Sequence, residues 1–300
     1  MTKLSRESAG RVLIAYLAMH VAELRLQGTR LRADEPGAVH EMRIAARRVR
    51  SALATYRPLF DAHSIDHIGE DLQWLGRSLG DARDAQVLRE RLGELVAAES
   101  PELVLGPVAN RVDDELRAAE RAGMEQALLA LDSERYVRLL AALDELVTAA
   151  PVVPEAASPA TEVLPGLLRR DAKRLRRSVK AIDRSRTREQ RDVALHEARK
   201  KAKRMRYAAE SAVPALGRPA KSLAGSAKKL QQALGEHQDA VVSRRRLREY
   251  AVRAHGRGEN GFTVGRLHAL EQRHADDAEQ KFSTAWKARP GKNVRRWTHT

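Results

Sequence analysis

Apolar residues along this chain recur every three or four positions, and no convincing run of alternating β-branched or aromatic residues interrupts that pattern. In the stretch 36–56, for example, Met42, Ala46, Val49 and Leu53 fall on one side of a helix. We therefore predict an all-α fold. The predicted helices span residues 4–27, 36–56, 64–79, 82–98, 103–131 and 134–149 in the first half, and 164–184, 189–211, 219–234, 237–254 and 263–288 in the second.

The polar side of the predicted helix 36–56 is cationic. His40, Arg43, Arg47 and Arg50 fall within about 80° of its circumference, and Arg48 flanks that arc. The same pattern returns 156 residues later in the predicted helix 189–211. There the corresponding residues are His196, Arg199, Lys203, Arg204 and Arg206.

A second pattern repeats at nearly the same offset: the Leu-Gly-acid run at 79–81 returns at 234–236. Two matches at one period indicate an internal duplication. In each copy the glycine predicts the end of one helix, and the acid predicts the start of the next. Asp84 and Asp239 also correspond, and we expect them to pair with basic side chains or to cap backbone donors.

The duplication predicts two helical repeats, at 1–150 and 164–288, each packed as an antiparallel bundle. Residues 151–163 lose the helical pattern and gather prolines, which predicts a linker. Residues 289–300 lack an apolar stripe, which predicts a loose basic tail. Thr187 and Gln190 have the spacing of a capping box before the second cationic helix.

Charge is distributed unevenly over the 300 residues, whose net charge is +15. Residues 1–150 carry 20 Lys and Arg against 24 Asp and Glu, whereas residues 151–300 carry 35 against 16. The densest segment, 165–210, has 17 basic and 6 acidic side chains. Such a segment repels itself unless solvent or a partner neutralises it, so we expect an anionic partner.

The chain has no cysteine, which excludes disulfides and thiolate metal sites and suits the cytoplasm. Residues 12–21 form an apolar run after three basic residues, as in a signal peptide. His20 interrupts the run, no small-residue cleavage pattern follows, and the run is too short to span a membrane. We therefore expect a buried first helix, no membrane partner and a cytoplasmic protein.

The two motifs His-x-x-Arg-x-x-x-basic-Arg-x-Arg, together with the Leu-Gly turns, resemble the CHAD family, the conserved histidine α-helical domain. The resemblance covers nearly the whole chain. It implies two four-helix bundles related by a pseudo-twofold axis, a basic central channel that binds inorganic polyphosphate, and association with polyphosphate granules. Some relatives also carry a CYTH domain, but we find neither room for one nor its Glu-x-Glu-x-Lys motif, so we expect the CHAD domain to stand alone.

Carried over by position, the resemblance implies that both cationic helices bind polyphosphate. Its residues are then His40, Arg43, Arg47, Arg48, Arg50, His196, Arg199, Lys203, Arg204 and Arg206. Six further cations either extend this cleft or form a solvated outer face: Lys173, Arg176, Arg177, Lys180, Lys228 and Lys229.

Two other functions stay open on the sequence alone. The pI near 10.5 also fits nucleic-acid binding, although 4% aromatic residues leave few platforms for stacking bases. The histidines could serve a metal-dependent phosphohydrolase, and His63 and His67 have the i, i+4 spacing of metal ligands. No third ligand, Walker loop or nucleophile elbow accompanies them. We therefore expect a non-catalytic protein without metal or cofactor, whose oligomeric state the sequence does not indicate.

Overall fold

The computed structural model describes residues 7–288, which contain ten α-helices and no strand, so the all-α prediction is confirmed. Residues 1–6 and the predicted tail 289–300 lie outside the described residues. Short 3₁₀ helices occur at Arg57–Leu59, Pro101–Leu103 and Pro154–Ala157. The α-helices are α1 (Ala9–Arg32), α2 (Ala38–Tyr56), α3 (Ala62–Ser78), α4 (Gly80–Ala97), α5 (Val108–Leu131), α6 (Glu134–Thr148), α7 (Ala160–Ile182), α8 (Arg188–Leu216), α9 (Arg218–Gly256) and α10 (Phe262–Ala288).

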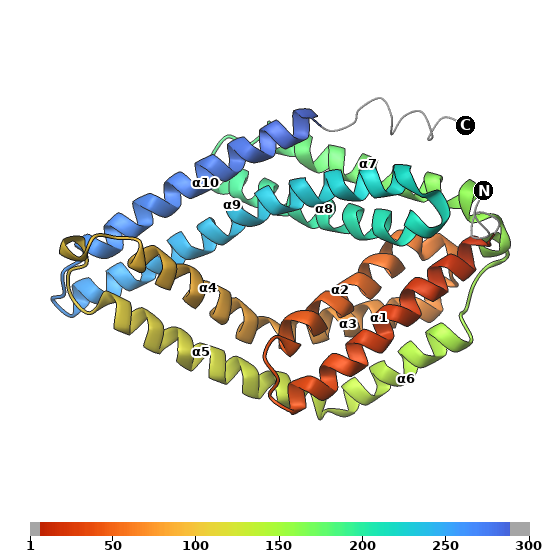
Figure 1. The fold of residues 1–300 in the computed structure, drawn as a ribbon, viewed down its shortest axis with the longest axis horizontal. Coiled ribbons are helices and arrows are strands. Elements are labelled where there is room, and N and C mark those ends of the chain that lie inside the picture. Colours follow the sequence, from red (N-terminus) through yellow and green to blue (C-terminus); the bar gives the residue numbers. More distant parts are fainter. Residues whose placement is uncertain (1–6, 289–300) are drawn as a thin grey trace.

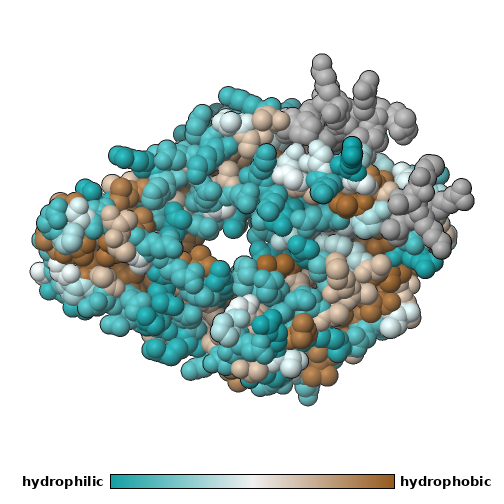
Figure 2. All heavy atoms as spheres, viewed as in Figure 1, coloured by the Kyte–Doolittle hydropathy of each residue, from teal (hydrophilic) through white to brown (hydrophobic). Residues whose placement is uncertain are grey.

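The helices form an elongated molecule around an opening (Figure 1). At one end α1 packs on α2 and α6, and α3 packs on α2 and α6. At the other end the α4–α5 hairpin meets α9, which runs between α8 and α10. Figure 2 shows that the opening passes through the molecule and that hydrophilic residues cover most of its rim. The helices around it are α2, α4, α8 and α9 (Figure 1).

The hydrophobic cores draw on both halves of the sequence. The larger core runs from Ala9 in α1 to Phe282 in α10. A smaller core joins Leu92 of α4 and residues of α5 to Leu247 of α9 and Leu267 of α10. The α4–α5 hairpin of the first half is therefore held by apolar burial against the second half.

The predicted linker 151–163 is packed against the rest of the molecule. Val152 forms an antiparallel bridge with Phe60, and Pro159 forms one with Ser8. Ala156 is buried between these bridges, and α7 already begins at Ala160. The division of the chain into two repeats stays a prediction.

The predicted helix end at residues 234–236 is wrong, because α9 continues through Gly235 as one helix of 39 residues. A glycine inside a helix costs only about 1 kcal/mol, and the burial of Leu234 and Ala240 on either side stabilises the helix. In the first copy, Leu79 alone separates α3 from α4. The same motif therefore gives a one-residue break in one half and no break in the other.

The second cationic helix also runs further than predicted, through Pro214 to Leu216. Proline disrupts helices, but Ala212 and Ala215 are buried and hold this last turn in the core. At its other end α8 begins as predicted: Thr187 is the N-cap, and its hydroxyl accepts a hydrogen bond from the Gln190 backbone N–H at 3.2 Å.

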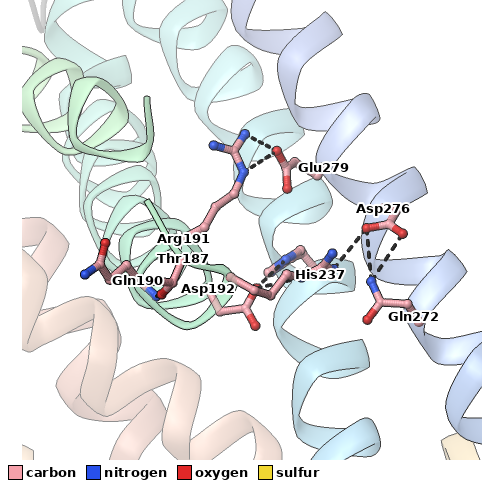
Figure 3. Close-up of polar contacts among 9 residues, drawn as sticks. Thr187, Gln190, Arg191, Asp192, His237, Gln272, Asp276 and Glu279 are labelled. Carbon is pink, nitrogen blue, oxygen red and sulfur yellow. Dashed lines mark hydrogen bonds and ion pairs between the residues drawn. The ribbon is translucent and has the colours of Figure 1, made fainter. Parts of the chain in front are cut away.

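Polar contacts fix α8 against α9 and α10 (Figure 3). Arg191 of α8 pairs with Glu279 of α10 (Figure 3). His237 of α9 lies beside Asp192 of α8; it is 1% exposed, and its Nε2 lies 3.3 Å from Asp192 Oδ1 (Figure 3). Burial lowers the pKa of His237, while the Asp192 charge opposes that shift. The second half is thus held by charged as well as apolar contacts.

Candidate functional site

The two cationic helices, α2 and α8, pack directly against each other. Alanines such as Ala198 and Ala202 are fully buried on α8, and such small side chains allow close packing of helices. The hydroxyl of Tyr56, at the end of α2, donates a hydrogen bond to the Ala208 carbonyl of α8 at 2.9 Å. Cations from sequence positions about 156 residues apart therefore share one surface.

A pocket of about 620 Å³ opens between α2, α3 and α8. Every ionisable side chain that lines it is basic, and no carboxylate does so. Small residues from α3, including Gly69 and Gly76, leave the space open: a Cβ atom added at either would meet nothing within 4 Å. We call it the basic pocket; its cations are Arg43, Arg47, Arg50, Arg77, Lys200, Lys201, Lys203 and Arg204.

Burial and mutual repulsion act together on the charges in this pocket. Burial, followed by the neighbouring charges of Arg47, Arg199 and Arg43, lowers the pKa of Lys203 to about 6. Burial also lowers the pKa of Arg47, and so do Arg43, Arg199 and Arg50. An anion in the pocket would relieve this repulsion, which makes it a candidate anion site.

The two repeated motifs of each half meet in space. An Nη atom of Arg43 donates hydrogen bonds to the Gly80 carbonyl at 2.7 Å and to Asp84 at 3.0 Å. In the second half the guanidinium of Arg199 lies over Gly235, 3.7 Å from where a Cβ would stand. The Leu-Gly motif therefore supplies a backbone surface on which the first arginine of each repeated cationic motif rests.

The two histidines lie beside these contacts in unlike surroundings. His196 Nδ1 lies 2.7 Å from the Gln238 side-chain oxygen of α9. His40 lies near Arg83, the residue equivalent to Gln238 in the first half. Burial lowers the pKa of His40, and the Arg83 charge lowers it further. His40 is consequently neutral near pH 7, and neither histidine lines the basic pocket.

Two corresponding acids approach the same cations from α4 and α9. Asp84 pairs with Arg43, as expected from the sequence. Burial raises the pKa of Asp239, while Arg199, Arg91 and Lys203 oppose this shift and Asp84 adds to it. These acids partly neutralise Arg43 and Arg199, and they leave Arg47, Arg50 and Lys203 without an ion pair among the described residues.

Two arginines that flank the cationic arcs are neutralised by carboxylates. Arg204 Nε lies 3.1 Å from the buried Asp171 of α7, and it also bonds Thr55 of α2 at 3.1 Å. Arg48 pairs with Glu210 of α8 at 3.3 Å. Both arginines therefore join α2 and α8 to each other or to a third helix.

A family model described as the CHAD domain matches residues 15–248. The chain belongs to the CHAD family. It is 38% identical over 265 residues to two proteins of Mycobacterium tuberculosis, uncharacterized protein MT2285 of strain CDC 1551 / Oshkosh and uncharacterized protein Rv2226 of strain ATCC 25618 / H37Rv. Each match covers 88% of this chain and 50% of the relative, so the chain spans half the length of the curated relatives it matches.

Two solved structures share the fold. PptA from Streptomyces chartreusis has a TM-score of 0.76 and 22% identity, with 94% of this chain and 100% of that chain covered. The CHAD domain from the plant Ricinus communis has a TM-score of 0.64 and 21% identity, with 99% and 93% covered. The helices of this chain therefore form the CHAD fold.

The CHAD domain brings only some of the predicted binding residues together. Arg43, Arg47, Arg50, Lys203 and Arg204 line the basic pocket. Three others, His40, His196 and Arg199, lie at the contacts between motifs, and Arg48 and Arg206 lie beside Glu210. Four are exposed on α7, namely Lys173, Arg176, Arg177 and Lys180. Lys228 is exposed on α9, and Lys229 lines a separate pocket of about 1030 Å³ between α4, α9 and α10.

Three cations of the basic pocket were missed in the sequence: Arg77, Lys200 and Lys201. Lys200 and Lys201 stand inside the second repeated motif, so counting every basic residue of that motif finds them. Arg77 comes from α3, and nothing in the sequence shows that α3 faces α8.

Other candidate sites stay without support in the structure. His63 and His67 are exposed, and within residues 7–288 no group of three or more His, Asp or Glu side chains could hold a metal ion.

Across the same residues no helix has the length and apolar character to cross a membrane.

Proposed function

We propose that this CHAD domain is a non-catalytic module that captures inorganic polyphosphate electrostatically in the basic pocket. One observation carries the proposal: within the described chain, arginine and lysine are the only ionisable residues that line the pocket. Guanidinium groups offer paired donors to phosphate oxygens and stay charged, and lysine adds a compact charge. A partner that carries one negative charge or more in every repeating unit fits such a lining.

The pocket is also shared by the two halves of the chain. Arg47 and Arg50 come from α2, whereas Lys203 comes from α8. We propose that α2 and α8 are duplicated helices of two four-helix bundles related by a pseudo-twofold axis, and that the basic pocket belongs to a central cleft between them. The matched contacts of Arg43 with Gly80 and of Arg199 with Gly235 support this duplication.

As part of the same proposal, the domain is cytoplasmic and attaches the protein that carries it to polyphosphate granules. Binding without hydrolysis suits that role, because a domain that cleaved polyphosphate would release itself from the granule. Incubation with polyphosphate and Mg²⁺ or Mn²⁺ should then release no phosphate. Sustained release that substitution of His40 and His196 abolished would replace the binding module with an enzyme.

Nucleic acid is the second candidate, favoured by the same surplus of positive charge. Base stacking needs open aromatic faces. No aromatic residue lines the basic pocket within the described chain, and Tyr207 of α8 is buried, with Arg48 at 5.3 Å and Arg206 at 5.6 Å from its ring centre. We therefore favour a phosphate polymer without bases.

Charge reversal tests the proposal. The variant Arg47→Glu, Arg50→Glu, Lys203→Glu should bind long-chain polyphosphate at least about a hundredfold more weakly at low salt, because each change replaces attraction by repulsion. The matched control changes three exposed arginines that have no ion pair with a described carboxylate: Arg121→Glu, Arg245→Glu and Arg273→Glu. Equal weakening in both variants, or displacement of polyphosphate by DNA at equal phosphate concentration, would refute the proposal.

A further inference from the structure

The outer side of α7 carries a second group of cations that the basic pocket does not use. Lys173, Arg176, Arg177 and Lys180 are exposed, and none has an ion pair with a carboxylate in the described part of the chain. We call these four residues the α7 face. The opposite side of the helix is buried and includes Leu168, Leu175, Val179 and Ile182, so packing holds the four cations outward.

The α7 face is connected to the basic pocket through Asp171. This buried carboxylate accepts a hydrogen bond from Arg204 of the pocket at 3.1 Å and another from Arg174 of α7 at 2.7 Å. The charge of Arg174 also lowers the pKa of Arg204, after the larger effect of burial. Arg174 is therefore linked to the pocket residue Arg204 through a shared carboxylate.

From Arg174 the cations continue around the helix. At 100° per residue, Arg177 lies about 60° and Lys173 about 100° further round than Arg174, away from the buried side. Between residues 172 and 182 the sequence of α7 contains no acid. The carboxylate between Arg204 of the pocket and Arg174 is Asp171, which both arginines neutralise. Beyond Arg174 the cations of α7 continue to the outer surface without a further acid before the end of the helix.

We propose that the α7 face is a second anion-binding surface, along which the part of a long polyphosphate chain that extends beyond the basic pocket continues. This inference rests on the proposed function and adds a dependence on chain length. A chain held in the pocket places its next phosphates near α7 at high effective concentration. Weak exposed contacts then add to affinity, although no single one of them would capture a free phosphate.

Two ligands of different length test the α7 face. The variant Lys173→Gln, Arg176→Gln, Arg177→Gln, Lys180→Gln is titrated with tripolyphosphate and with long-chain polyphosphate over a series of salt concentrations. We expect long-chain affinity to fall by about tenfold or more and the magnitude of its salt slope to fall by up to about 3. Tripolyphosphate affinity should change less than about twofold, because that ligand fits within the pocket.

The control Arg121→Gln, Arg245→Gln, Arg248→Gln, Arg273→Gln has the same change in charge on exposed residues. The inference is overturned if the α7 variant binds the long chain as well as the control does, or if both ligands lose affinity equally. It is also overturned if the α7 variant loses duplex DNA and retains the long polymer. Absence of any polyphosphate binding by the unaltered domain would instead refute the proposed function.

Discussion

Lys203, a buried cation of the basic pocket, should make polyphosphate affinity depend on pH. Its pKa is lowered to about 6 by burial and by Arg47, Arg199 and Arg43, so in the empty pocket it is mostly neutral at pH 7. A phosphate bound beside it favours the charged form and raises its pKa. Binding of polyphosphate should therefore take up a proton, and affinity should rise as the pH falls toward 6.

The size of this pH effect follows from the linkage between the protonation of Lys203 and the binding of polyphosphate. A lysine with a free-state pKa of about 6 and an ordinary pKa when bound takes up about one proton per site at pH 8. Affinity then falls by up to about tenfold for each pH unit above 6, or about 1.4 kcal/mol. The pKa values of Asp239 and His40, which lie near the pocket cations, are also shifted. A variant of Lys203 itself is therefore needed to assign the pH dependence to the lysine.

Isothermal titration calorimetry in buffers of different ionisation enthalpy measures the proton uptake directly. Long-chain polyphosphate is the ligand of choice because its terminal phosphates, which titrate near neutral pH, are few. The variant Lys203→Arg keeps its charge at pH 8 and should bind with little pH dependence. Lys203→Met should lose both the affinity at pH 6 and the slope. Zero proton uptake at pH 8, or the same slope in the unaltered protein and in Lys203→Arg, would refute the reasoning.

Three further predictions concern the pocket and its frame. Gly76→Glu adds a carboxylate at the basic pocket, at a position where a Cβ atom meets nothing within 4 Å, so polyphosphate affinity should fall by about tenfold or more. Gly93→Glu, on the exposed side of α4, should not change the affinity, and equal affinities of the two variants would contradict the pocket's position. Arg204→Met removes one of the two arginine partners of the buried Asp171 and should lower the free energy of unfolding in urea by about 2 kcal/mol, with part of the loss restored by adding Asp171→Asn. An unchanged free energy of unfolding would show that the Arg204–Asp171 pair does not stabilise the fold. Burial, followed by the charge of Arg48, lowers the pKa of His20 to about 4, so the unfolded chain binds this proton more tightly and the free energy of unfolding should fall by about 3 kcal/mol as the pH falls from 6.5 to 4. His20→Gln should flatten that pH dependence in urea unfolding, whereas an identical pH profile would assign the acid sensitivity to other groups.

Helix content was predictable because each helix buries one continuous stripe, which leaves a clear period in the sequence. The continuation of α9 through Gly235 was not predictable. A local rule associates glycine with helix ends, but the outcome here depends on the burial of Leu234 and Ala240 by neighbouring helices. The sharing of a core between α4, α5, α9 and α10 likewise depends on contacts between residues distant in sequence.

The centre of the candidate site was predictable because α2 and α8 repeat one cationic pattern, and Arg47 and Lys203, at corresponding positions of that pattern, both line the pocket. Periodicity could not separate pocket cations from paired ones. Arg48 and Arg204 look like their neighbours in sequence, and only the fold shows that Glu210 and Asp171 neutralise them.

A crystal structure of the domain with a bound oligophosphate tests the central claim most directly. The account predicts phosphate groups in the basic pocket between α2, α3 and α8, within hydrogen-bonding distance of Arg47, Arg50 and Lys203. Phosphates bound at full occupancy elsewhere, with that pocket holding only water, would contradict it.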